Sequence, residues 1–162
     1  MRTGRHGQCS HLMVAFLVPG LLLAGTLGPA AALADEGHQA GLVVLPEDGE
    51  VITRCISFQE EEVTGAELLT RSGLEVILDP SGFMGITICQ IEGLGCSFPE
   101  EPCFCQCMGG GECAYWNYYY RDGSQEDWVY SALGAALHQA RDGSVEAWVW
   151  GDGHTPPDDS LT

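Results

Sequence analysis

Five cysteines lie close together in the middle of this 162-residue chain, and their sulfurs are its strongest candidates for chemistry. Cys103, Cys105 and Cys107 alternate along the chain, with Cys96 before them and Cys113 after them. In an extended chain, alternate side chains point the same way, so the three sulfurs would project from one side, as a soft metal requires. Zinc sites, however, usually have two well-separated Cys-x-x-Cys arms, and the chain has none. Disulfides, a thiolate metal site and redox activity all stay open, and the pattern favours disulfides.

The N-terminal segment predicts export. Arg2 and Arg5 precede an uncharged run over residues 12–33, and small residues separate this run from Asp35. This order of a positive, an apolar and a small-residue region is that of a secretory signal. We expect residues 1–34 to be cleaved after Ala34, although the run is long enough to stay as a membrane anchor. The mature chain should therefore be secreted or extracytoplasmic, and membrane-attached only if uncleaved.

The cysteine count supports a disulfide framework. Of the eight cysteines, Cys9 lies in the presumed signal, which leaves seven in the mature chain. An oxidising compartment lets thiols pair, and a small domain gains stability when its unfolded state is constrained. We expect six of the seven to pair in a connectivity that the spacing does not choose, and the odd one to be free, intermolecular or bound to something else. The seven are Cys55, Cys89, Cys96, Cys103, Cys105, Cys107 and Cys113.

The charge of the chain excludes one class of partner. After residue 34 the chain keeps four arginines, no lysine and all 23 acidic residues, for a formal charge of −19. A surface of one negative sign repels phosphate backbones, so nucleic acid is excluded as a partner. Most of the carboxylates should simply solvate the surface.

The segment over residues 115–120 is a predicted strand of aromatic residues. Alternation places Trp116, Tyr118 and Tyr120 on one face, and Tyr115 and Tyr119 on the other. One set must belong to the core, and an exposed set beside a rigid loop would stack on a flat ring, a sugar or a partner's apolar edge. We expect Trp116, Tyr118 and Tyr120 to bind the ligand, with Phe104 and Gln106 of the cysteine loop as a lid.

The remaining pattern predicts one small α+β domain over residues 41–151. A hairpin should form from residues 41–45 and 51–58, followed by a short helix over 65–72. Thr64 and Glu67 fit a capping box at the start of this helix, and Gly73 fits its left-handed end. Further extended segments are expected at 74–78, 85–92, 128–131 and 145–150, with a tight turn at Asp142-Gly143. Residues 35–40 should be a flexible lead and 152–162 a disordered tail.

Several short motifs resemble the C-terminal domain of the transcobalamin and intrinsic-factor proteins, which is also found alone in exported bacterial proteins. They are TGAELL at 64–69, ICQIEG at 88–93, YW at 115–116, GA at 134–135, DG at 142–143 and VEAW at 145–148. The resemblance implies a β-grasp-like mixed sheet packed on one short helix, with a long cysteine-rich loop and a soluble-ligand-binding role. Relatives that handle corrinoids bind cobalamin between this domain and a helical domain. The sequence pattern predicts no such helical domain within these 162 residues, and the cysteine set resembles a bacterial subset with the same Cys-Phe-Cys-Gln-Cys loop.

These observations favour an exported, non-catalytic domain that captures a small ligand, such as a corrinoid or another flat ring compound, for delivery to a membrane uptake system. Ser131, His138 and Asp142 are residue types of a hydrolytic triad, but no nucleophile-elbow motif surrounds Ser131. We therefore expect no catalytic residues, no metal site and no cofactor, with cobalamin considered only as a ligand. The alternatives are a disulfide-stapled structural or protein-interaction module and a thiolate metal-binding protein.

Overall fold

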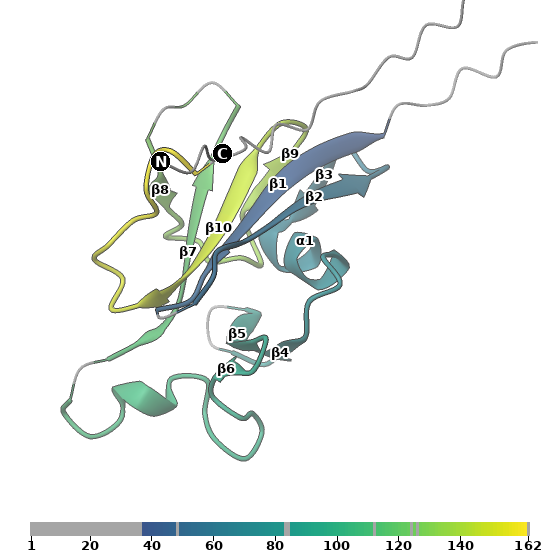
Figure 1. The fold of residues 1–162 in the computed structure, drawn as a ribbon. Coiled ribbons are helices and arrows are strands. Elements are labelled where there is room, and N and C mark those ends of the chain that lie inside the picture. Colours follow the sequence, from purple (N-terminus) through teal and green to yellow (C-terminus); the bar gives the residue numbers. More distant parts are fainter. Residues whose placement is uncertain are drawn as a thin grey trace, which may run out of the picture.

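The computed structural model of this chain describes residues 37–47, 49–82, 85–111, 113–123, 125 and 127–161. It shows an α+β fold in which a five-stranded mixed sheet carries one short helix against one face (Figure 1). The strand order is β2-β1-β10-β7-β8. The strands are β1 (His38–Leu45), β2 (Ile52–Phe58), β7 (Tyr115–Arg121), β8 (Val129–Tyr130) and β10 (Val145–Gly151).

At the centre of the sheet, the first strand of the domain pairs with the last one. β1 forms the predicted hairpin with β2 and pairs in parallel with β10, Gly41 opposite Val145 and Leu45 opposite Val149. All other pairs in this sheet are antiparallel. Since β1 and β10 run in parallel, their carboxyl ends reach the same edge of the sheet. β1 begins at His38, so the predicted flexible lead is wrong for residues 38–40, whose backbone gains sheet hydrogen bonds.

The helix α1 (Gly65–Arg71) begins and ends as its sequence predicts. The Thr64 hydroxyl accepts a hydrogen bond from the backbone N–H of Glu67, and the Glu67 carboxylate accepts one from the N–H of Thr64. Gly73 follows the helix with a φ of 76°, the left-handed region that favours glycine. A helix of seven residues is marginal alone. Its apolar face is therefore buried against the sheet through Ala66, Leu68 and Leu69.

Two small sheets complete the fold. β3 (Glu62–Thr64) pairs with β9 (Gln139–Arg141), and the sequence analysis predicts neither strand. β4 (Val76–Asp79), β5 (Thr87–Ile91) and β6 (Leu94–Gly95) form an antiparallel sheet that lies beside the cysteine loop (Figure 1). A single turn of 3-10 helix, η1 (Cys105–Cys107), occupies the middle of that loop.

The main core lies between the helix side of the large sheet and α1. It contains alternate residues of the strands, among them Leu42 and Val44 of β1 and Trp148 and Trp150 of β10. Ile56 and Phe58 of β2 join it, as their alternation predicts. A smaller cluster around Val43, Tyr119 and Ala147 lies on the opposite face of the sheet.

The C-terminal segment covers part of that opposite face. The Tyr119 hydroxyl donates to the carbonyl oxygen of Gly153, and the Trp128 ring N–H donates to that of Asp158. The Arg121 guanidinium lies over the Trp128 ring and donates to the carbonyl oxygen of Leu161. The prediction of a disordered tail after residue 151 is therefore wrong for residues 152–161. Proline and aspartate are compatible with an irregular segment that is ordered by tertiary hydrogen bonds.

The predicted signal over residues 1–34 lies outside the described residues. Within the described part of the chain, no helix has the length and apolar character needed to cross a membrane.

Candidate binding site

The aromatic face predicted to bind a ligand is buried in the main core. Trp116 is 6% exposed and Tyr118 is 4% exposed. The Trp116 ring packs edge-on against Trp150 and its N–H donates to the carbonyl oxygen of Leu94, 3.0 Å away. The expectation that Trp116 and Tyr118 form an exposed stacking surface is therefore wrong. This face of β7 is the one on the same side of the sheet as α1, so its large rings fill the core.

Tyr118 and Tyr120 belong to a polar cluster inside this core. The Tyr118 hydroxyl donates to the carboxylate of Glu146, and its ring stacks on Trp148. Burial, and then the charge of Glu146, raises the pKa of Tyr118. Tyr120 is half-buried and stacks on the His138 ring at a centroid distance of 3.8 Å. Tyr118 is therefore a core ring, and one face of the Tyr120 ring is covered by His138.

Glu146 is the residue of this cluster that the sequence analysis missed. Its carboxylate is fully buried, accepts a hydrogen bond of 2.8 Å from the Ser144 hydroxyl and lies 3.6 Å from the His138 ring nitrogen Nε2. Buried carboxylates are rare unless paired or hydrogen-bonded. The alternation of β10 could have indicated this burial, since Glu146 shares a strand face with Trp148 and Trp150. These contacts satisfy the buried carboxylate within the core.

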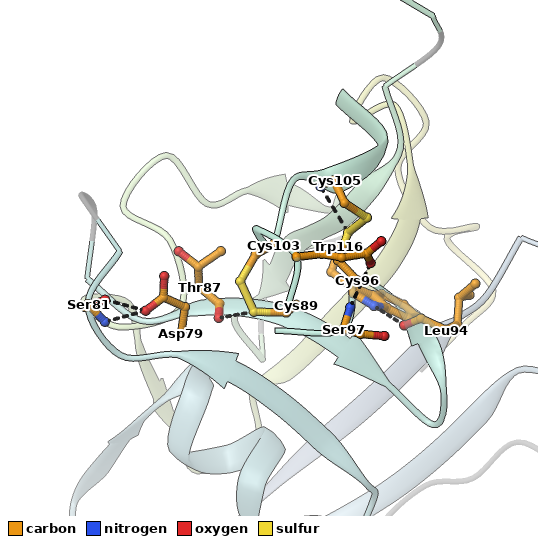
Figure 2. The surroundings of a disulfide bond; sticks show 11 residues. Asp79, Ser81, Thr87, Cys89, Leu94, Cys96, Ser97, Cys103, Cys105 and Trp116 are labelled. Carbon is orange, nitrogen blue, oxygen red and sulfur yellow. Dashed lines mark hydrogen bonds between the residues drawn. A yellow bond between two sulfur atoms is a disulfide. The ribbon is translucent and has the colours of Figure 1, made fainter. Parts of the chain in front are cut away.

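The cysteine loop is joined by three disulfides, as predicted. Cys89 bonds Cys103, Cys96 bonds Cys105, and Cys107 bonds Cys113 (Figure 2 shows the first two). The three alternating sulfurs therefore bond three different partners, and none of them is a thiolate available to a metal. Figure 2 also shows the Trp116 ring N–H donating to the carbonyl oxygen of Leu94, so the strand that leads into the loop contacts the large sheet through a core ring.

Cys55, the seventh cysteine, lies on the exposed face of β2, away from this loop. No cysteine among the described residues is free. The expected odd thiol is therefore not found as a free group in this part of the chain.

Phe104 and Gln106 lie on the disulfide-linked loop, where both side chains are exposed. The Phe104 ring is 47% exposed. It packs edge-on against the Tyr115 ring, with 5.5 Å between the two ring centroids. Tyr115 is on the face of β7 opposite Trp116, Tyr118 and Tyr120. The fold therefore does not bring the five predicted ligand residues together, because the predicted lid lies against the other face of the strand.

That other face carries a second set of rings. Tyr119 packs edge-on against Tyr130, which is 48% exposed. Burial first, and then a hydrogen bond with Tyr130, raises the pKa of Tyr115 to about 12. Phe104, Tyr115 and Tyr130 thus form a partly exposed aromatic row, which we call the outer row. Among the described residues, the exposed rings of β7 and its neighbours therefore belong to the face opposite the one predicted to bind the ligand.

An open pocket of about 700 Å³ lies at the edge of the large sheet where β1 and β10 end. Pockets of 300–1,000 Å³ are typical of small-molecule sites. The wall comes from the segment after β1, the start of β7, the end of β10 and the C-terminal segment. It includes Glu47, Ala114, Asn117, Trp150, Asp152 and Gly153. Sequence reasoning missed this pocket, because three distant segments meet there only through the pairing of β10 with β1 on one side and with β7 on the other.

Asn117 is the most buried polar residue in the pocket wall, at 2% exposure. Its amide nitrogen donates to the carbonyl oxygens of Tyr115, Val149 and Gly151 at 3.0, 3.4 and 2.9 Å. These bonds hold together the end of β10 and the start of β7. Its amide oxygen, Oδ1, is buried without a hydrogen-bond donor.

The comparisons with known proteins leave the family of this chain unassigned. No protein-family model matches the sequence, and no curated protein matches it either. Its function must therefore be argued from its own residues.

Proposed function

We propose that this chain is an exported, non-catalytic binding domain that captures a small ligand in the pocket at the ends of β1 and β10. The observation that carries this proposal is the pocket itself, with a volume of about 700 Å³ and a wall built from three segments distant in sequence. Three disulfides within residues 89–113 support an oxidising, extracytoplasmic environment.

We further propose that the fold is β-grasp-like. A β1-β2 hairpin, a helix packed across the sheet and a final strand in parallel with β1 are the features that support it. The motifs that resemble the transcobalamin and intrinsic-factor domain make corrinoids the first ligands to test. Fold alone does not carry function, so the ligand must be identified by measurement. Delivery to a membrane uptake system is the role that the resemblance and the predicted export favour.

Titration of intrinsic tryptophan fluorescence tests this function, because Trp150 lines the pocket and contacts Trp116. Cobalamin, other corrinoids, tetrapyrroles and fractionated cell extract are added to the mature domain, and calorimetry checks each apparent hit. The variant Ala114→Phe should fill the pocket and remove saturable binding. The matched control, Ala132→Phe, places the same ring on an exposed loop and should bind like wild type. The proposal fails if nothing binds, or if Ala114→Phe binds as tightly as Ala132→Phe.

A protein-interaction module is the second candidate, and the cysteine loop favours it. Phe104 is 47% exposed and Met108 is 71% exposed, so the loop presents apolar side chains on a covalently linked backbone. Large exposed apolar side chains on a rigid segment are typical of protein contacts. Loss of partner binding in a Phe104→Ser, Met108→Ser variant, with ligand binding unchanged, would favour this role.

A further inference from the structure

The fixed charge of the pocket wall is negative among the residues that the structure describes. The ionisable side chains there are the carboxylates Glu47 and Asp152, together with His154, and no described arginine or lysine lines the pocket. Two of the four arginines after residue 34 pair elsewhere, Arg71 with Glu60 and Arg141 with Glu62. A pocket of this charge repels carboxylates and phosphates and attracts cations.

The most buried polar side chain of the pocket wall also presents an unused hydrogen-bond acceptor. Asn117 uses its amide N–H groups on backbone carbonyls, so the group left over is the acceptor Oδ1. A buried acceptor without a donor costs about 1–3 kcal/mol. This oxygen is buried against Gly153, so a ligand N–H group that displaced the Gly151–Gly153 segment would reach it and remove that cost. The unpartnered atom thus selects for a donor, independently of the charge of the carboxylates.

Asp152 and Asn117 lie on adjoining parts of the wall. Gly153 approaches Asn117 so closely that a Cβ at this position would lie 2.6 Å from Oδ1. Gly151 and Gly153, on either side of Asp152, have φ values of 155° and 83°. Both are in the region that favours glycine, which lets this short segment pass directly over the amide. Asp152 is thereby the chain neighbour of the glycine that lies against the unpartnered amide oxygen.

We propose that the ligand of this pocket is a cation that bears N–H donors, such as an amidinium, a guanidinium or a primary ammonium group. Its charge interacts with the carboxylates of Glu47 and Asp152, and one N–H group donates to Asn117 Oδ1. This inference rests on the proposed function of the pocket and names the chemical class of its ligand. The cationic group is then the part of the ligand that determines its affinity for the pocket, and any ring contributes less.

Three small probes of nearly equal shape test this inference. Benzamidine is a cationic donor, benzamide is neutral and benzoate is an anion, so they differ mainly in charge and in donors. Each is titrated into the isotope-labelled mature domain and followed by the amide resonances of Gly151, Gly153 and the Asn117 side chain. We expect benzamidine to bind at least about tenfold more tightly than benzamide, and benzoate to leave these resonances unshifted.

Variants then assign the charge contribution. Glu47→Gln and Asp152→Asn should each weaken benzamidine about threefold, the size expected for exposed charge pairs. The matched control, Glu50→Gln, removes an exposed carboxylate outside the pocket wall and should leave affinity unchanged. Raising the salt concentration should weaken benzamidine and not benzamide.

The result that overturns this inference differs from the one that overturns the proposed function. If benzamide or benzoate binds as tightly as benzamidine, or if benzamidine does not bind, the cation class is wrong. The pocket still has its proposed role if any ligand binds in wild type and Ala132→Phe but not in Ala114→Phe. If no ligand shows that dependence, the site itself is wrong.

Discussion

The helix side of the large sheet and the cysteine loop are stabilised by different kinds of buried side chain. On the helix side, Leu42, Leu68 and Leu69 are at most 1% exposed, and regular strands and a capped helix surround them. In the loop and its anchoring strand, Cys89 and Cys96 are fully buried, whereas Phe104 and Met108 are exposed. The loop therefore buries half-cystines where the rest of the domain buries aliphatic residues.

This difference explains how a small domain keeps a long irregular segment ordered. Residues 96–114 contain one turn of 3-10 helix and no strand among their described residues. Such a segment has few backbone hydrogen bonds to offset its conformational entropy. Disulfides lower the entropy of the unfolded chain instead. The comparison predicts that the two regions respond differently to mutation and to reduction.

The largest expected effect is on the helix side. Leu68→Ala removes a side chain that is 0% exposed, and it should lower the free energy of unfolding by about 3 kcal/mol through lost burial and a cavity. Urea denaturation followed by circular dichroism measures it. The control Leu133→Ala removes a side chain that is 58% exposed and should change stability by less than about 0.5 kcal/mol. Similar losses for both variants would contradict the assigned core.

The next effect is on the loop. The double variant Cys96→Ala, Cys105→Ala opens a disulfide that spans nine residues, and it should cost about 2.5 kcal/mol. Hydrogen exchange should speed up within residues 96–111 and remain slow in β1 and β10. Equal loss of protection in both regions would show that the loop disulfides stabilise the whole domain. The two regions would then not be stabilised independently.

A smaller effect is expected at the helix cap. Thr64→Ala removes the hydroxyl that caps α1 and should cost about 1 kcal/mol. Hydrogen bonds from Thr64 lower the pKa of Glu67 below its usual 4.5. The hydroxyl bond to the Glu67 carboxylate is present above that pH and is lost as the pH falls, whereas the cap bond from the Glu67 N–H does not titrate. The stability difference between the variant and wild type should therefore become smaller in acid without disappearing. Thr70→Ala, on an exposed position of the same helix, should show no such pH dependence.

The smallest effect is a change in the tyrosine titration. Burial and Tyr130 raise the pKa of Tyr115 to about 12, so the neutral ring is favoured in the folded state. Its contribution to stability is complete below the usual value of about 10 and is lost as the pH rises toward 12. Spectroscopic titration of Tyr130→Phe should show one tyrosine with a lowered pKa. An unchanged titration of the remaining tyrosines would contradict the outer row as described.

Local features of the chain were predictable because their causes are local. The cap at Thr64 and Glu67, the Gly73 stop, the β1-β2 hairpin and the alternation of β7 all depend on residues a few positions apart. The short strands β3, β6 and β9 were not predicted, since two or three residues carry no periodicity and pair only through tertiary contacts.

The candidate site was mispredicted because the burial of its residues also depends on tertiary contacts. The alternation of β7 separated the two sets of rings correctly, but it contains no information on which face meets α1. The helix covers the face of Trp116 and Tyr118, so these rings became core and Phe104 met Tyr115 instead. The buried carboxylate of Glu146 likewise depends on partners 8 to 28 residues away.

By itself, the sequence determined that this is an α+β chain with a capped helix, a disulfide-rich loop and a strongly acidic balance. Only the tertiary structure decided which cysteines pair, which rings are buried and where a pocket opens. The pairing of β1 with β10 brings together residues about a hundred positions apart. Such contacts depend on the free energy of the whole packed core, which no short segment specifies.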